Sequence, residues 1–342
     1  MKRPSCVSRR LVCGVAAALI SAQAFAQQAD PERLIEAGHW KRARALVETR
    51  LRQSPGDALS TYLLSQIHHA FGDDSTPRQL AETAVALDRS VAKYHRQLAE
   101  TMGIQAQHAG PIQLIVLARQ FRRELDTAIA LDPHDVLAQR DLLEYFLVAP
   151  GIAGGDVQKA AGVAEHMAEL DVAEGLLARA RVAQYRGQTS QAEGFLRRAA
   201  SSQPTSVRAQ LELARFHAAK EHFNREAAET EAKEVLKIDR SRAEAWAILA
   251  EIYAGIGQWT DLDDTLSEAT REIPDDLAPY YRAAETLLGN ARDPVRAERY
   301  LRTYLTQETE GNEPTSADAW RKLDLAIKAQ GGQVHTSHSG TK

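Results

Sequence analysis

Apolar residues recur at three- and four-residue spacing along most of the chain, and short polar turns separate these stretches. Trp246, Leu249, Ala250 and Tyr253 share one face of a helix, for example, and a second such face begins at Trp259. Alanine is abundant, whereas aromatic residues make up only 6% of the chain. This pattern and composition favour packed helices over sheets.

The polar turns recur with a period. Pro55 and Arg89 are 34 residues apart, as are Asp239 and Ile273, and the steps between these pairs range from 32 to 44 residues. The turn sequences, in chain order, are SPGD, LDRS, LDPHD, LDVAE, QPTS, IDRS and IPDD. A period near 34 indicates an array of helix–turn–helix units.

Within one unit the order of small and large residues is specific. In residues 173–206 it reads Leu176, Ala180, Ala183, Gly187, Ala192, Leu196, Ala199 and Pro204. This order resembles the tetratricopeptide repeat, W-x2-L-G-x2-Y followed by A-x3-F, A and P. The resemblance covers nearly all of the chain after residue 26 and implies an all-α superhelical solenoid. Small residues at the helix crossings allow close packing, and they are Ala180, Ala214, Ala250 and Ala284. Larger residues that fill the seam with the next unit are Leu196, Leu266 and Leu301.

We divide the chain into three parts. Residues 1–26 read as a signal peptide, residues 27–330 as the solenoid, and residues 331–342 as a disordered tail. The solenoid comprises a partial first unit, seven full units and a capping helix: about 29–57, 58–91, 92–135, 136–172, 173–206, 207–242, 243–276 and 277–316, then Ala317 to Gln330. Stacking is required because one helix pair cannot bury its apolar face alone.

The N-terminus predicts export. Four basic residues precede an apolar run of ten, and Ala24-Phe25-Ala26 forms a small-residue cleavage site. The run is too short to span a bilayer, and the alternative is a buried N-terminal helix. Cleavage after Ala26 removes both cysteines, which suits an oxidising compartment. We therefore expect a periplasmic or secreted protein.

Charge argues against some classes of partner. Without its first 26 residues the chain has 38 basic and 46 acidic residues, a net charge of −8. Such an acidic protein is a poor candidate for binding nucleic acid or anionic lipid. No later segment is apolar enough for membrane insertion.

A glycine-rich stretch, APGIAGGDV at 149–157, raises the question of a phosphate loop. Its glycines do not fit G-x-G-x-x-G, and Asp156 stands where G-K-[ST] would continue. We interpret it as a five-residue insertion in a helix–helix turn, in which Pro150 ends one helix and Asp156 caps the next. The phrase resembles an insertion in a subset of secreted bacterial tetratricopeptide proteins, which implies a lengthened turn and no known activity.

No cofactor, metal site or catalytic site is predicted. The histidines lack ligand spacing: His68 and His69 are adjacent, and His217 and His222 are five apart. Carboxylate clusters at 261–264, 73–74 and 275–276 lie at turns and helix starts, where the helix dipole favours acids. Motifs for serine, zinc and cysteine hydrolases are absent.

The resemblance also implies a binding surface, because the first helices of tetratricopeptide arrays line a concave groove that holds a peptide. Carried over position by position, this groove comprises Tyr62, Gln66, Arg96, Arg140, Glu144, Arg181, Gln184, Tyr185, Arg208, Arg215, Glu251, Tyr281 and Glu285. The centre is basic, so we predict that Arg140, Arg181 and Arg215 engage an acidic segment or a C-terminal carboxylate. The alternative is a solvated face with internal ion pairs, such as Arg140 with Glu144.

The predicted function is a non-enzymatic scaffold that binds a protein or peptide, as an adaptor, assembly factor or chaperone-like protein of the cell envelope. One alternative is an accessory subunit of an envelope polysaccharide or secretion machine. A remote alternative is an enzyme or small-molecule binder with a pocket near 103–113, lined by His108.

Overall fold

The fold is entirely helical, as predicted. The computed structural model describes residues 30–73, 76–311 and 314–331, and these contain α-helices and two short 3₁₀ turns but no strand. The predicted signal peptide and, beyond Gly331, the predicted tail lie outside these residues. The helices, in order, are α2 (Pro31–Glu36), α3 (Trp40–Gln53), α4 (Ala58–Ala70), α5 (Thr76–Leu87), α6 (Ala92–Gln107), α7 (Pro111–Leu131), α8 (Val136–Val148), α9 (Val157–Leu170), α10 (Val172–Tyr185), α11 (Thr189–Ser202), α12 (Val207–Ala218), α13 (Arg225–Ile238), α14 (Ala243–Ile256), α15 (Trp259–Glu272), α16 (Ala278–Gly289), α17 (Pro294–Tyr304) and α18 (Ser316–Ala329), with η1 (Gly151–Ala153) and η2 (Lys220–His222).

Consecutive helices pack as pairs, and successive pairs stack. α6 packs along α7 and α10 along α11, while α14 contacts α16 of the next pair. The alanines that the repeat pattern places at the helix crossings, for example Ala214 and Ala250, are completely buried. Helices that cross this closely have room only for small side chains, so the recurring alanines in the sequence indicate where the helices approach each other.

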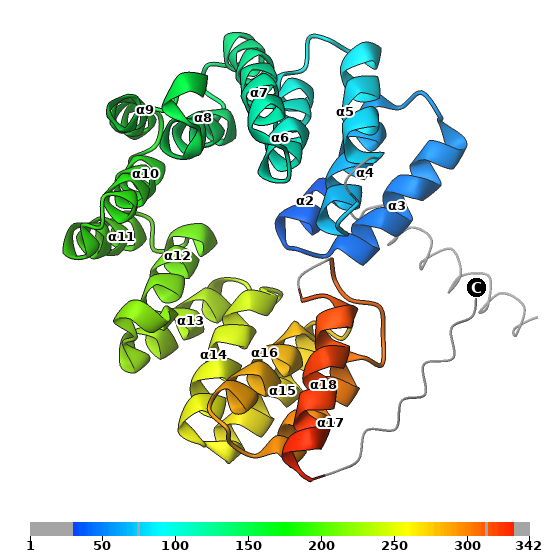
Figure 1. Cartoon of the computed structure of the whole chain (residues 1–342), viewed down its shortest axis with the longest axis vertical. Helices are drawn as coiled ribbons and strands as arrows, with labels where there is room; N and C mark the ends of the chain where they lie inside the picture. The colour runs from blue at the N-terminus through cyan, green and yellow to red at the C-terminus, as the bar shows by residue number, and fades with distance from the viewer. Residues whose placement is uncertain (1–29, 74–75, 312–313, 332–342) are drawn as a thin grey trace, which may run out of the picture.

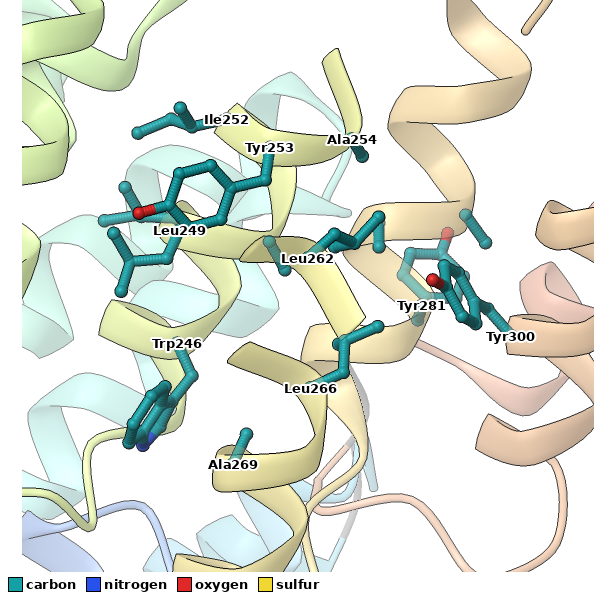
Figure 2. Packing of buried hydrophobic residues seen from close by; sticks show 14 of the residues in the cluster. Trp246, Leu249, Ile252, Tyr253, Ala254, Leu262, Leu266, Ala269, Tyr281 and Tyr300 are labelled. Atoms are coloured by element: carbon teal, nitrogen blue, oxygen red, sulfur yellow. The ribbon is translucent and has the colours of Figure 1, made fainter. Parts of the chain in front are cut away.

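The largest cluster of buried apolar residues joins the units near the C-terminus. Figure 2 shows Trp246 and Leu249 on one side of α14, and Leu262 and Leu266 of α15 on the other side, toward Tyr281 of α16. The indole Nε1–H of Trp246 donates a 2.8 Å hydrogen bond to the carbonyl of Arg240, so this ring is buried without leaving a polar group unpaired.

The apolar core is continuous along the array. It divides into five clusters of buried residues that share helices. α6 contributes to three of them, α10 joins one of these three to a fourth, and α12 joins the fourth to the fifth. Every unit is therefore held to the next by buried apolar surface, as repeat architectures require. None of the helices that the structure describes combines the length and the apolar character that a bilayer crossing requires.

The array curves until its two ends meet. In Figure 1 the helices follow one another around a ring, with α8, α10 and α12 on the inside of the curve and α9 and α11 outside. The start of α3 lies against the turn between α15 and α16 and against the loop between α17 and α18, where Lys41 and Arg44 contact Glu310 and Glu308. This end-to-end contact was not predicted from the sequence.

The glycine-rich insertion is a compact turn. α8 ends at Val148, η1 follows, and the Asp156 carboxylate accepts hydrogen bonds from two backbone N–H groups at the start of α9, which is the predicted cap. Gly154 has φ of 109°, and a Cβ on Gly155 would lie 1.8 Å from the carbonyl oxygen of Ala149. Glycine is needed here for backbone geometry and close approach, as expected for a structural turn.

Candidate binding surface on the inner helices

The first helix of each pair supplies the inner surface. Tyr62 and Tyr281, both assigned to the groove from the sequence, are buried within seams instead of presented to a ligand. Tyr62 packs its ring 5.2 Å from that of Tyr94, and Tyr281 donates a hydrogen bond to Asp318 of the last helix. Burial raises the pKa of Tyr62 to about 12. Tyr185 is about half exposed at the end of α10, so it remains available for contact.

Arg96 lies in a buried ionic cluster that joins neighbouring units. Its guanidinium donates to Glu100 of α6 and, at 3.4 Å, to Asp141 of α8. Burial raises the pKa of Asp141 to about 7; the Glu100 carboxylate adds to this effect and Arg96 opposes it. Arg96 is therefore committed to holding α6 against α8.

The two arginines at the centre of the predicted stripe also have intramolecular partners. Arg181 forms a bidentate pair with Glu144 of the preceding inner helix, with N–O distances of 2.7 and 2.8 Å. Arg215 forms a bidentate pair with Glu244 of the following inner helix and contacts Glu212 at 2.9 Å. Glu144 thus pairs with Arg181 and not with Arg140. The centre of the stripe is a ladder of ion pairs that link successive units.

Two other arginines of the same surface keep donors without partners. No hydrogen bond or ion pair forms from Arg140 to any described residue, and its Nε–H is buried. On Arg208 the buried Nε and Nη1 atoms make no hydrogen bond, although Nη1 forms a loose ion pair with Glu174 of α10 at 3.5 Å. Burial lowers the pKa of Arg140, and the nearby positive charge of Arg208 lowers it further. The Glu174 carboxylate acts on both guanidinium groups, but it leaves these buried N–H groups without a hydrogen bond.

Glu251, farther along the surface, is a partly buried acid that also lacks a partner among the described residues. Burial raises its pKa to about 7; the Arg282 guanidinium opposes this shift, while Glu285 and Glu244 add to it. Within the described residues Glu251 makes no hydrogen bond or ion pair. The inner surface therefore holds an unpaired guanidinium on α8, a loosely paired one on α12 and an unpaired carboxyl on α14.

Other polar groups noted in the sequence have structural roles. His217, buried between α11 and α13, contacts Glu231 at 2.7 Å and Glu193 at 3.2 Å, a pairing that no sequence pattern indicated. His108 is exposed, at the end of α6. Across the described ranges no group of three or more His, Cys, Asp or Glu side chains has the arrangement of a metal site, and His335 and His338 lie outside them.

Three surface cavities lie between successive second helices and not at the 103–113 segment. The cavity between α9 and α11 has a volume of 340 Å³, and the one between α11 and α13 has a volume of 680 Å³. The cavity between α13 and α15 has a volume of 370 Å³. The cavity between α13 and α15 has Trp246 and Tyr253 at its base and opposing charged walls from α13 and α15. None of these three cavities is lined by His108, which would have been the sign of the small-molecule alternative.

Paired helices, buried alanines at their crossings and a single terminal helix define a tetratricopeptide-like α-solenoid. No protein-family model matches the chain, and no curated protein matches it. Among solved structures it is similar to the Cut9–Hcn1 hetero-tetramer of the APC/C, with 15% identity and a TM-score of 0.42. That match covers 87% of this chain and 48% of the other, so the chain spans about half the length of that relative.

Two bacterial structures are also similar. PilF of Pseudomonas aeruginosa matches with 12% identity and a TM-score of 0.37, over 67% of this chain and 97% of that one. A thermophilic TPR protein of Thermus thermophilus matches with 20% identity and a TM-score of 0.37, over 68% of this chain and 99% of that one.

Proposed function

We propose that this protein is an exported, non-enzymatic scaffold that binds a segment of another protein on its inner helices, within the periplasm or outside the cell. The helical array supports the general role, because repeat solenoids present a long curved surface of side chains from successive units. The basic, apolar and small-residue order of residues 1–26 supports export. Processing at Ala26 is tested by fractionating cells that express the full chain and sequencing the N-terminus.

The observation that carries the proposal is the pair of unsatisfied arginines. Arg140 and Arg208 lie on inner helices two units apart and hold buried N–H groups that donate no hydrogen bond, and Arg208 has only a loose ion pair with Glu174. Buried donors of this kind raise the free energy of the unliganded protein until an acceptor reaches them. A carboxylate is suited to the site because its two oxygens match the paired N–H groups of guanidinium. The partner is therefore an acidic segment or a C-terminal carboxylate.

Arg181 and Arg215 are weaker candidates for this role. Each already forms a bidentate pair with a glutamate on a neighbouring helix. A ligand would have to replace those pairs, and the displaced glutamates would repel its carboxylate. We assign these arginines to positioning the inner helices.

Binding of a fluorescent peptide with two acidic residues and a free C-terminus tests the proposal, with the amidated peptide as a comparison. We expect Arg140→Ala and Arg208→Ala each to weaken binding about tenfold or more, since a hydrogen bond to a charged group contributes about 1.5–3 kcal/mol. Arg179→Ala is the matched control, because Arg179 pairs with Glu165 between α9 and α10 and does not belong to the predicted groove. Equal affinities for all three variants would rule the site out.

Capture from an envelope fraction identifies the physiological partner. The unmodified chain and the Arg140→Ala variant would be used as paired baits, followed by mass spectrometry. A partner held by the first and lost by the second is expected to have an acidic segment or terminus. A partner that survives purification with the protein would favour the role of accessory subunit over that of a transient adaptor.

A further inference from the structure

The two ends of the array are joined mainly by polar contacts, and the indole of Trp40 at the start of α3 lies beside Gly311 of the α17–α18 loop. The backbone N–H of Lys41 donates a 2.7 Å hydrogen bond to the Glu310 carboxylate, and its ammonium donates to the carbonyls of Asp275 and Glu308 at 2.5 and 2.7 Å. Arg44 holds both carboxylate oxygens of Glu308 at 2.9 Å. Nearby, the Arg242 guanidinium donates to the carbonyl of Glu36, the last residue of α2.

At this junction, one end of the chain supplies most of the positive side chains and the other end supplies the negative ones. In the ion pairs between side chains, the cations belong to the first turns of α3, in the sequence WKRAR at 40–44, and the acids belong to the C-terminal turns and loop at 275 and 308–310. Arg242 differs, because it lies in the C-terminal half and donates to a backbone carbonyl. Arg42 also pairs with Asp275, at 2.5 Å. One end of the array therefore presents a basic surface, and the other end presents the acidic surface that covers it.

The apolar core does not cross the junction. The cluster that contains Val47 extends from α3 to α6, and the cluster that contains Leu323 extends from α12 to α18. No cluster of buried apolar residues in the described ranges includes members from both ends, whereas every other contact between units is built on one. Separating the ends would expose charged groups and the contact between Trp40 and Gly311, but it would not open a cluster of buried apolar residues.

Solvent reaches part of this contact. The Arg44 and Glu308 side chains are 31% and 57% exposed, whereas Lys41 and Glu310 are 15% and 2% exposed. Exposed ion pairs are weak and are screened by salt. The buried pair also carries a desolvation cost, since burial raises the pKa of Glu310 to about 7 even though Lys41 opposes the shift.

We infer that the junction is a separable electrostatic latch, which opens between α3 and the α17–α18 loop while the units on both sides stay folded. Opening widens access to the inner helices from one side and bares a basic surface on α3. Partner access rests on the proposed function, but the opening is a property of the free chain and can be measured without a ligand. The two proposals can therefore fail separately.

The distance between two dyes in the full chain measures the opening. Cys6 and Cys13 are replaced by serine, and cysteines for labelling are placed at the exposed positions Glu48 on α3 and Lys328 on α18. Raising the salt concentration from 0.1 to 1 M shortens the Debye length from about 10 to about 3 Å. We expect energy transfer to fall as salt rises, and to fall at 0.1 M salt in a variant that carries Lys41→Glu, Arg42→Glu and Arg44→Glu.

Rescue and control variants make the test specific. Adding Asp275→Lys, Glu308→Lys and Glu310→Lys to that variant should restore energy transfer. Three reversals on other paired arginines, Arg122→Glu, Arg179→Glu and Arg197→Glu, should leave it unchanged. A second dye pair at Glu48 and Thr83, both near the N-terminal end, should not respond, and helical circular dichroism should be constant. Unchanged transfer in the first variant and in 1 M salt, a response of the second dye pair, or dimerisation would each overturn the latch.

Discussion

The seam between α14 and α16 and the junction between α3 and the α17–α18 loop both join helical units, but they use opposite chemistry. In the seam, Leu287, Ala250 and Ala284 are fully buried and contribute no polar group. At the junction, the contact is made mainly by charged side chains and backbone carbonyls. Apolar burial is nearly independent of salt, whereas an ionic contact is screened. The first kind of contact fixes the curvature of the array, and the second kind lets its ends respond to conditions.

The largest effect is expected inside a seam. Leu287→Ala should lower the free energy of unfolding by about 2–5 kcal/mol, because it removes buried methyl groups and leaves a cavity. Urea denaturation followed by circular dichroism measures this loss. Leu325→Ala on α18 is the control: that side chain is mostly exposed, and its removal should change stability by less than about 0.5 kcal/mol. Equal losses would contradict the seam as the main source of stability.

A glycine tests how closely the helices of a pair approach. A Cβ on Gly175 of α10 would lie 2.3 Å from the Cα of Ala168 on α9, so Gly175→Ala should destabilise the protein by roughly 1–3 kcal/mol. Gly162, within α9, has no atom within 4 Å of such a Cβ. Gly162→Ala should instead stabilise the protein by about 0.5–1 kcal/mol, because alanine restricts the backbone of the unfolded chain more than glycine does. A calorimetric melting temperature that moves the same way in both variants would refute this assignment.

The partly buried carboxyl of Glu251 should make stability depend on pH. Because its folded pKa is raised from 4.5 to about 7, the folded protein binds more protons than the unfolded chain between those values, and stability falls as pH rises through that window. Glu251→Gln should therefore stabilise the protein above pH 7, by on the order of 1–3 kcal/mol. The gain should shrink as pH falls toward 4.5. A gain that is the same at pH 4.5 and pH 8 would show that the carboxyl is not the cause.

The smallest effect on global stability is expected at the junction. Arg44→Glu breaks a partly exposed ion pair, so the free energy of unfolding should change by less than about 1 kcal/mol. Urea denaturation of this variant beside Leu287→Ala sharpens the comparison directly. A loss as large as that of the seam variant would mean that the junction is part of the folding core.

Local residue order determined the fold and the insertion. Alanines recur at the same position of successive units, such as Ala180 and Ala214, because closely packed helix pairs need small residues there. The cap at Asp156 depends only on its immediate neighbours in the sequence. The periodicity of the array is a short-range property, and each unit repeats it. For that reason the all-α solenoid class could be predicted from the chain alone.

The inner surface was harder to predict. Its residues could be placed on one face, but the partner of each arginine depends on the angle between units: Arg181 reaches back to Glu144, while Arg215 reaches forward to Glu244. The carboxylate pair at 275–276 read as a helix start, and Asp275 is in fact a contact of Lys41, more than 230 residues earlier. No period relates these two positions, so only the accumulated curvature of the intervening units brings them together.

That curvature has a mechanical consequence. An array with free ends behaves as a spring, in which each unit can tilt without affecting distant ones. When the ends are joined, the array becomes a closed hoop. A change in the tilt of one helical unit must then be compensated by other units around the ring. A ligand that draws α8 and α12 toward each other through Arg140 and Arg208 would load the rest of the hoop. The junction, which has no apolar core across it, is the place where that load is released first.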